Sequence, residues 1–305
     1  MEENHFEKIC TIKSNNNVNV SLYRSKLSGM RVAFVEQPTL IVNGRFTLAT
    51  KATSDDDLPH TLEHLTFEGS QKYPYKGFLN IVANQCFGSD INGSTAQDHT
   101  FYSISTVGQE GFLKILPIYL DHLFFPLLSP EQYITKIHHI NAEGRDGGVV
   151  YAEMQDLENS ISTKMNSALH RIVFPKGHPY RANTGGSLPA IRDLCSLERI
   201  KAFHKEYYRP SNMMITIVGN IDVQKVTDIL STFEKQYNDF SCKIYPFHDV
   251  TVPEYFPFQL EHIKYPAEDE SVGRVSITWQ GPPFATPDTF ALPYLLLHFI
   301  SDPET

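Results

Sequence analysis

The sequence predicts an α+β fold, in which helices pack on one face of a mixed or antiparallel β-sheet. Three observations support this fold class. Short segments rich in β-prone residues gather in the first fifty residues, at 31–35 and 45–50. Long stretches with apolar residues three or four positions apart, typical of amphipathic helices, fill the middle of the chain. A continuous apolar run at 213–218, closed by Gly219, has the composition of a buried strand.

The individual elements are predicted from local signals. The strands lie between turn-forming residues, and the helices carry an apolar stripe at helical spacing. The stretch at 149–174 keeps this stripe throughout, so we expect one long helical run there. In chain order we expect strands at 31–35 and 45–50, a helix around 60–64 and another near 76–86, a strand at 100–107, helices at 111–128, 149–174 and 197–208, a strand at 213–218 and a helix at 223–237.

The chain is expected to hold one domain and the start of another. Its 305 residues can bury a sizeable core. Residues 238–266 are polar, aromatic and proline-bearing, and we interpret them as a linker that closes an N-terminal domain spanning 1–266. A strand at 274–279 and a helix at 289–300 follow, and such a pair cannot bury a core alone. Residues 267–305 are therefore interpreted as the beginning of a second, truncated α/β domain.

Composition argues against two classes of partner. The net charge is −9 and no basic stripe is visible, which argues against nucleic acid. No run of about 18 apolar residues is present, so no membrane span is predicted.

The cysteines and the N-terminus bear on the cellular location. The four cysteines are widely spaced and fit reduced thiols. The acidic N-terminus resembles neither a signal peptide nor a transit peptide. We expect a cytoplasmic location, with the mitochondrial matrix less favoured.

The most informative motif covers residues 60–64, with the sequence HTLEH. Residues four apart on a helix share one face, so His60 and His64 can direct ring nitrogens at one point, with Glu63 beside them. Two imidazoles and a carboxylate suit a zinc ion that carries a water. A chance pair is the alternative, because the chain has 13 histidines and such pairs usually lie on a solvated face or in a core.

The residues before the motif favour a helix that begins just ahead of it. Three aspartates at 55–57 offer an N-cap and negative charge, and Pro59 is tolerated in a first turn. Apolar residues at 58, 62 and 65 form a stripe beside the histidine pair. The order His-x-x-Glu-His is that of the inverzincin metallopeptidases, the reverse of His-Glu-x-x-His.

A zinc ion with two histidine ligands usually takes a carboxylate as the third. The candidates are Glu153 and Glu158 on the predicted long helix and Glu143 in the loop before it. Glu153 lies next to the apolar stripe and so near the core face, whereas Glu158 is expected on the solvent side. An ordinary surface carboxylate is the alternative for any one of them.

Further segments carry a family resemblance beyond the motif. The relevant residues are 60–65 (HTLEHL), 69–70 (GS), 73–77 (YPYKG), Asn92, Thr95, Asp98, Thr100 and Tyr102, with 148–154 (GVVYAEM) and 180–186 (YRANTGG). In this order, from about residue 20 to the end, the chain resembles the pitrilysin or insulin-degrading-enzyme family of inverzincin zinc metallopeptidases. The segments at 148–154 and 180–186 are most similar to its presequence-protease branch.

The resemblance implies a domain of the LuxS and processing-peptidase type and assigns roles to several residues. His60, His64 and Glu153 match the zinc ligands, with Glu143 held in reserve, and Glu63 matches the base that activates the water.

The resemblance also implies a place for the substrate. An extended peptide would add to a strand edge at Asn92, Gly93, Ser94 and Thr95. Gly93 stands where relatives often carry alanine. The alternative for this segment is a turn, because Asn-Gly is a strong turn signal.

The function implied is a zinc metallo-endopeptidase module that hydrolyses peptide bonds in unfolded peptides. Family members close a chamber around the substrate with a second half, which has no counterpart in these residues. We therefore expect this chain to need that half or a second chain, and to have weak or no activity alone. The alternative is a non-catalytic substrate-binding or assembly subunit with the same fold. A structural zinc site is disfavoured because such sites usually have cysteine ligands.

Overall fold

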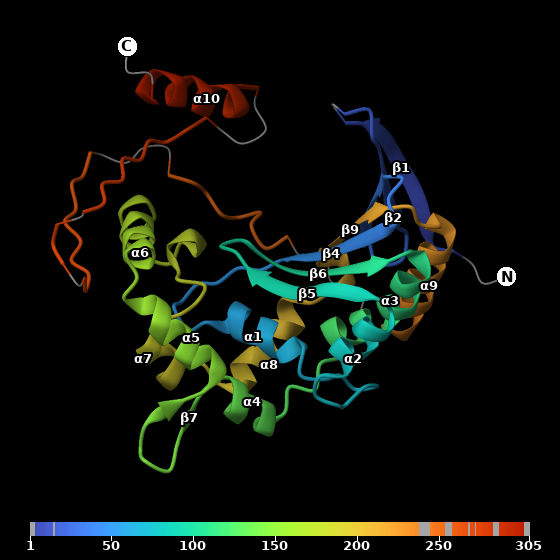
Figure 1. The fold of residues 1–305 in the computed structure, drawn as a ribbon, viewed down its shortest axis with the longest axis horizontal. Helices are drawn as coiled ribbons and strands as arrows, with labels where there is room; N and C mark the ends of the chain where they lie inside the picture. The colour runs from blue at the N-terminus through green and yellow to red at the C-terminus, as the bar shows by residue number, and fades with distance from the viewer. Residues whose placement is uncertain are drawn as a thin grey trace.

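The structure is a computed structural model, and it describes residues 4–14, 16–237, 245–253, 258–267, 269–271, 273–282 and 287–301. Its central element is a seven-stranded mixed sheet (Figure 1). The strands are, in their order across the sheet, β1 (Phe6–Lys13), β2 (Asn19–Ser25), β3 (Arg31–Glu36), β9 (Met213–Gly219), β4 (Ile41–Ala49), β6 (His99–Val107) and β5 (Gly88–Thr95).

The apolar run predicted at 213–218 forms β9, the central strand of this sheet. β9 pairs parallel with β3 on one side and antiparallel with β4 on the other. Its residues alternate between buried and half-buried, because one face of the strand meets the helices and the other meets the open side of the sheet. β9 thus joins the strands β1–β3 to the strands β4, β6 and β5.

Helices cover one face of the sheet, as Figure 1 shows. Along β4 the side chains of Val42, Phe46 and Leu48 are fully buried toward the helices, whereas Asn43 and Arg45 on the other face are exposed. The predicted α+β class with one helix-covered face is therefore confirmed. The covering helices are α1 (Leu58–Thr66), α2 (Phe78–Gln85), α3 (Gln109–Phe124), α8 (Leu197–Tyr207) and α9 (Val223–Gln236).

A second group of short elements lies beside α1 at one end of the sheet (Figure 1). α5 contacts α4, α6 and α7 in this group, so its position is fixed from several sides. The elements are α4 (Pro130–Lys136), β7 (His139–Ile140), β8 (Asp146–Gly147), α5 (Val149–Glu158), α6 (Ile161–Val173), the 3-10 helix η1 (Pro179–Arg181) and α7 (Leu188–Asp193); a second 3-10 helix, η2 (Pro210–Asn212), leads into β9.

The long helical run predicted at 149–174 is wrong in one respect, because two helices occupy it. α5 ends at Glu158, and Ser160 begins α6 by accepting a hydrogen bond from the backbone N–H of Thr163 at 3.1 Å. Serine at such a position competes with the continuing helix by capping a new one. The apolar spacing alone could not reveal this break.

The strand predicted at 274–279 is also wrong. These residues form no ladder with any other described segment, and Val275 and Trp279 are exposed. A β-prone sequence becomes a strand only when a partner strand is available. The predicted helix after it is present as α10 (Pro287–Ser301). The predicted domain boundary at 266 stays a prediction, and part of the predicted linker, 238–244 and 254–257, lies outside the described residues.

Two further expectations concern cysteines and membranes. Cys10, Cys86 and Cys195 are free thiols, whereas Cys242 lies outside the described residues. Within the described part of the chain, no helix has both the length and the apolar character needed to cross a bilayer.

Candidate metal centre

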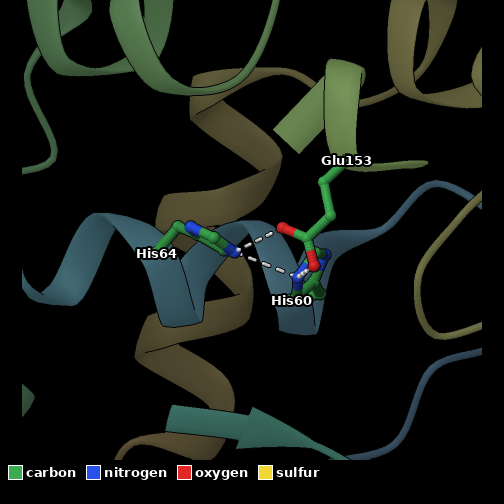
Figure 2. Close-up of side chains that lie close together, drawn as sticks. All are labelled: His60, His64 and Glu153. Atoms are coloured by element: carbon green, nitrogen blue, oxygen red, sulfur yellow. Dashed lines mark hydrogen bonds and ion pairs between the residues drawn. The ribbon is translucent and has the colours of Figure 1, made fainter. Parts of the chain in front are cut away.

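The structure brings together the three residues expected to bind metal (Figure 2). His60 and His64 lie one turn apart on α1, and their Nε2 atoms are 3.0 Å from each other. Glu153 reaches toward them from α5, with Oε2 3.4 Å from His64 Nε2 and Oε1 3.8 Å from His60 Nε2. One ligand atom from each residue thus lies within 4.8 Å of the others.

These separations fit a small divalent cation. Zinc binds imidazole nitrogen and carboxylate oxygen at about 2.0–2.2 Å, so two ligands of a tetrahedral ion lie about 3.3–3.5 Å apart. The three distances between donor atoms lie on both sides of this value. The side chain of Glu153 is 44% exposed, whereas that of His60 is 12% exposed. The Glu153 side of the site therefore faces solvent, whereas the His60 side is enclosed.

Glu153 is placed by a close approach of α5 to α4. Gly148, which precedes α5, has a φ of +127°, and a Cβ there would lie 2.2 Å from the carbonyl oxygen of Ile137. Only glycine allows this contact. Among the described residues, Glu143 and Glu158 belong to no group of potential metal ligands, and both are exposed. Of the three glutamates, Glu153 is the one that lies beside the histidine pair.

An aspartate occupies the N-cap position of the motif helix, as predicted, but its side chain contacts a histidine and does not cap the backbone. Asp57 occupies the N-cap position with a φ of +62°, and its side chain caps no backbone N–H. The carboxylate instead faces the ring of His60, with Oδ1 3.2 Å from Nδ1, and accepts a hydrogen bond from the Thr61 hydroxyl at 3.3 Å. Sequence reasoning missed this contact, although position 57 precedes His60 by three residues, the spacing of one helical turn.

Glu63, the expected base, is buried between α1 and β5. Its side chain accepts a 2.6 Å hydrogen bond from the hydroxyl of Thr95. Gly93 lies directly against it, because a Cβ at that position would be 2.5 Å from Oε1 of Glu63 and 2.6 Å from its Cγ. The absence of a side chain at Gly93 thus leaves room for the carboxylate beside the histidine pair.

The segment from Asn92 to Thr95 is a strand, so the turn alternative is wrong. These residues pair antiparallel with residues 100–103 of β6, after a register irregularity that follows Ser89. β5 is the last strand on this side of the described sheet. Its outer edge pairs with no further strand among the described residues, and the Thr95 side chain is engaged with Glu63.

Burial and nearby charges give the two histidines different pKa values. Burial lowers the pKa of His64 to about 4, and the neighbouring His60 and Lys136 act in the same direction. Burial also lowers the pKa of His60, but the carboxylates around it, Asp57 above all, outweigh burial and raise it to about 9. The two Nε2 atoms are 3.0 Å apart, so one proton can bridge the two rings. A divalent cation can take the place of that proton between the two Nε2 atoms.

The two buried carboxyl groups respond to burial in the opposite sense. Burial raises the pKa of Asp57 to about 6, with His60 opposing the rise. Burial also raises the pKa of Glu63, and the hydrogen bond from Thr95 opposes it. A carboxylate whose pKa moves toward neutrality is better able to accept a proton and release it again.

Two family models match the chain. Residues 55–178 match the model described as insulinase (peptidase family M16), and residues 195–303 match the peptidase M16 inactive domain. The chain belongs to peptidase family M16. All four of the residues that resemble the family's zinc ligands and base lie within the first match.

Several curated relatives extend this assignment to a branch. An uncharacterized protein from Caenorhabditis elegans is 39% identical over 94% of this chain, and one from Schizosaccharomyces pombe is 37% identical over 87%. The mitochondrial presequence protease of Eremothecium gossypii is 30% identical over 78%. This M16 chain thus belongs to the presequence-protease-like branch. It spans less than a third of the length of each relative: 29%, 26% and 24%, in the order given.

A solved structure supports the fold. The crystal structure of pitrilysin matches 82% of this M16 chain with a TM-score of 0.65 and 24% sequence identity, and the match covers 26% of the pitrilysin chain. The fold expected from the resemblance is therefore confirmed.

Proposed function

We propose that this chain carries the zinc site of a metallo-endopeptidase that hydrolyses peptide bonds in unfolded peptides. The observation that carries the proposal is the convergence of His60, His64 and Glu153 on one point, with the buried Glu63 next to them. Two imidazoles and one carboxylate leave an ion with net positive charge and an open position, which is typical of catalytic zinc.

The residues of the chain have distinct tasks in this proposal. His60, His64 and Glu153 hold the metal, which when bound would acidify a water and polarise the scissile carbonyl. Glu63 accepts the proton of that water and later delivers it to the leaving amine. Its Oε2 is occupied by the Thr95 hydroxyl, so Oε1 is the atom that would carry the proton.

The peptide substrate would bind as an added strand along the outer edge of β5. Backbone groups at Asn92, Gly93 and Ser94 would hydrogen-bond the peptide backbone, which does not depend on the substrate's sequence. An unfolded peptide presents an extended, unpaired backbone of the kind that can pair with this edge. This preference supports unfolded peptides as the substrate class.

A quantitative metal analysis joined to a cleavage assay tests the proposal. The purified chain should bind about one zinc ion, and Glu63→Gln should bind it equally well. In a polypeptide that continues into the later domains, the same substitution should lower peptide hydrolysis by roughly 10²-fold or more. Equal hydrolysis by wild type and Glu63→Gln would remove Glu63 as the base. Failure of the wild type to bind zinc would overturn the proposal as a whole.

The chain is much shorter than its relatives, and this difference should affect its rate of peptide cleavage. We propose that the chain alone is weakly active or inactive, because the other half of the chamber, or a second chain, would complete substrate binding. Cleavage of a quenched peptide by this chain should therefore be slower than cleavage by a polypeptide that continues into the later domains. Equal rates would contradict this part of the proposal.

We also propose a cytoplasmic location, which microscopy of the tagged protein would test.

A non-catalytic binding subunit is the second candidate. The match of residues 195–303 to an inactive-domain model favours it for that part of the chain. The presence of both histidines and both glutamates in the first match favours the catalytic alternative. The binding subunit would be supported if both this chain and the longer polypeptide bound peptides but showed no zinc-dependent cleavage.

A further inference from the structure

We propose that Asp57 is a positioning residue for the metal: its carboxylate fixes the ring of His60 so that Nε2 faces the ion. This inference rests on the proposed function, because it assumes that His60 is a ligand. The side chain of Asp57 is completely buried. Its two oxygens lie 3.2 and 3.3 Å from Nδ1 of His60, so the ring faces the whole carboxylate.

The contact selects one form of the imidazole. A carboxylate can only accept a hydrogen bond, so Nδ1 of His60 carries the proton and donates it. The lone pair of the neutral ring is then on Nε2, the atom that faces His64 and Glu153. A buried carboxylate that holds a ligand histidine in this way also makes the ring a stronger donor to the metal.

The backbone around Asp57 is built to keep the carboxylate there. Its φ of +62° lies in the left-handed region, which aspartate tolerates better than most residues. Gly186 lies against it, since a Cβ on Gly186 would be 2.6 Å from the Cβ of Asp57. Asp55 is tied to the same segment by hydrogen bonds from the backbone N–H groups of Asn183, at 2.7 Å, and Ser187, at 2.9 Å.

His64 offers a contrast within the same site. Among the described residues, its ring contacts involve Nε2, toward His60 and Glu153, and no hydrogen-bond partner is present at its Nδ1. Only one of the two histidine ligands is therefore oriented by a carboxylate. Without Asp57, neither ring would have its Nδ1 atom held by a hydrogen bond, and the ring of His60 would lose the contact that orients it.

Zinc affinity measured by competition with a chelator tests the inference. Asp57→Asn keeps the shape of the side chain and tolerates the backbone conformation, but removes the charge. Asp57→Gly removes the contact and adopts the same φ without strain. Both variants should bind zinc about 10- to 100-fold more weakly than wild type while keeping a stoichiometry of one.

Asp56→Asn is the matched control. Asp56 is the preceding residue and equally buried, but its carboxylate pairs with Arg199 and not with a histidine. We expect it to leave zinc affinity within about threefold of wild type, and circular dichroism should show each variant folded. NMR of ¹⁵N-labelled histidine gives a second readout: zinc-loaded wild type should retain a protonated Nδ1 on His60, and Asp57→Gly should exchange that proton faster.

The outcomes separate the two proposals. Wild-type affinity in both Asp57→Asn and Asp57→Gly would overturn the positioning role and leave the zinc site standing. An equal loss of affinity in Asp56→Asn would also overturn it, because the effect would then come from the loop as a whole. A wild-type chain that binds no zinc would overturn both the positioning role and the proposed function.

Discussion

The hydroxyl of Thr95 donates a 2.6 Å hydrogen bond to Oε2 of Glu63 and thereby links the edge strand β5 to the motif helix α1. The proposed base and the proposed substrate-binding edge are thus mechanically connected. The hydrogen bond favours the ionised carboxylate, so it opposes the rise in the pKa of Glu63 that burial causes. Changes at either end of this contact should affect the other.

Removing the hydroxyl should raise the pKa of Glu63 further. Thr95→Val keeps the shape of the side chain but leaves burial unopposed by this hydrogen bond. In ¹³C NMR titrations of the metal-free protein, the Glu63 carboxyl should therefore titrate at higher pH in Thr95→Val than in wild type. Thr95→Ser retains a donor and should titrate as wild type does. A Glu63 carboxyl that titrates identically in all three proteins would contradict the role given to Thr95.

A methyl group at Gly93 should push the Glu63 carboxylate away. The Cβ would lie 2.5 to 2.7 Å from three atoms of that side chain, and such overpacking typically costs about 1–3 kcal/mol. Gly93→Ala should lower the free energy of unfolding measured in urea by about this amount. Gly273→Ala is the control, because a Cβ there meets no atom of the described residues within 4 Å.

A double-mutant cycle makes the Gly93 prediction specific. In a Glu63→Ala background the clashing atoms are gone, so Gly93→Ala should cost much less than in wild type. An equal cost in both backgrounds would show that the strain arises elsewhere in β5.

The third ligand can be tested against its reserve. Glu153→Gln should weaken zinc binding by about 10-fold or more, because it removes the carboxylate that faces both histidines. Glu143→Gln alters an exposed side chain in the turn between β7 and β8 and should leave zinc affinity unchanged. Chelator competition measures both variants. The reverse ranking would transfer the ligand role to Glu143.

Acid should destabilise the protein partly through His204 on α8. Its ring lies 2.9 Å from the Leu123 carbonyl, and burial lowers its pKa to about 4. The unfolded chain binds this proton near pH 6.5, so stability falls as the pH drops from about 6.5 to 4, by roughly 1–3 kcal/mol.

His204→Gln keeps a donor for the carbonyl but cannot be protonated. Urea unfolding at pH 7, 6 and 5 should show a smaller loss of stability for this variant than for wild type. Parallel pH dependence in the two proteins would exclude His204 as a contributor.

The histidine pair could be predicted from sequence because helical periodicity places residues four apart on one face. Glu153 could be chosen only through the family resemblance, since no local pattern shows that α5 approaches α1. The role of Asp57 escaped prediction because aspartate before a helix usually caps the backbone, and a left-handed conformation that redirects the side chain has no sequence signature.

The sheet shows the same division between local and distant signals. β9 was predictable because its apolar run is continuous, but its place between β3 and β4 depends on long-range pairing. Asn92-Gly93 has the composition of a turn, yet pairing with β6 holds it extended. Residues 274–279 have the composition of a strand, yet no partner strand is present among the described residues.

The central position of β9 has a consequence for biosynthesis. The chain emerges from the ribosome with β1–β3 and β4–β6 already made, but these two sets of strands share no direct pairing across the gap that β9 fills. The two sets of strands can join only after β9, which ends at Gly219, has been synthesised, so the sheet of the nascent polypeptide stays incomplete until then. During that interval its unpaired strands are open to aggregation, and we expect molecular chaperones to engage it there.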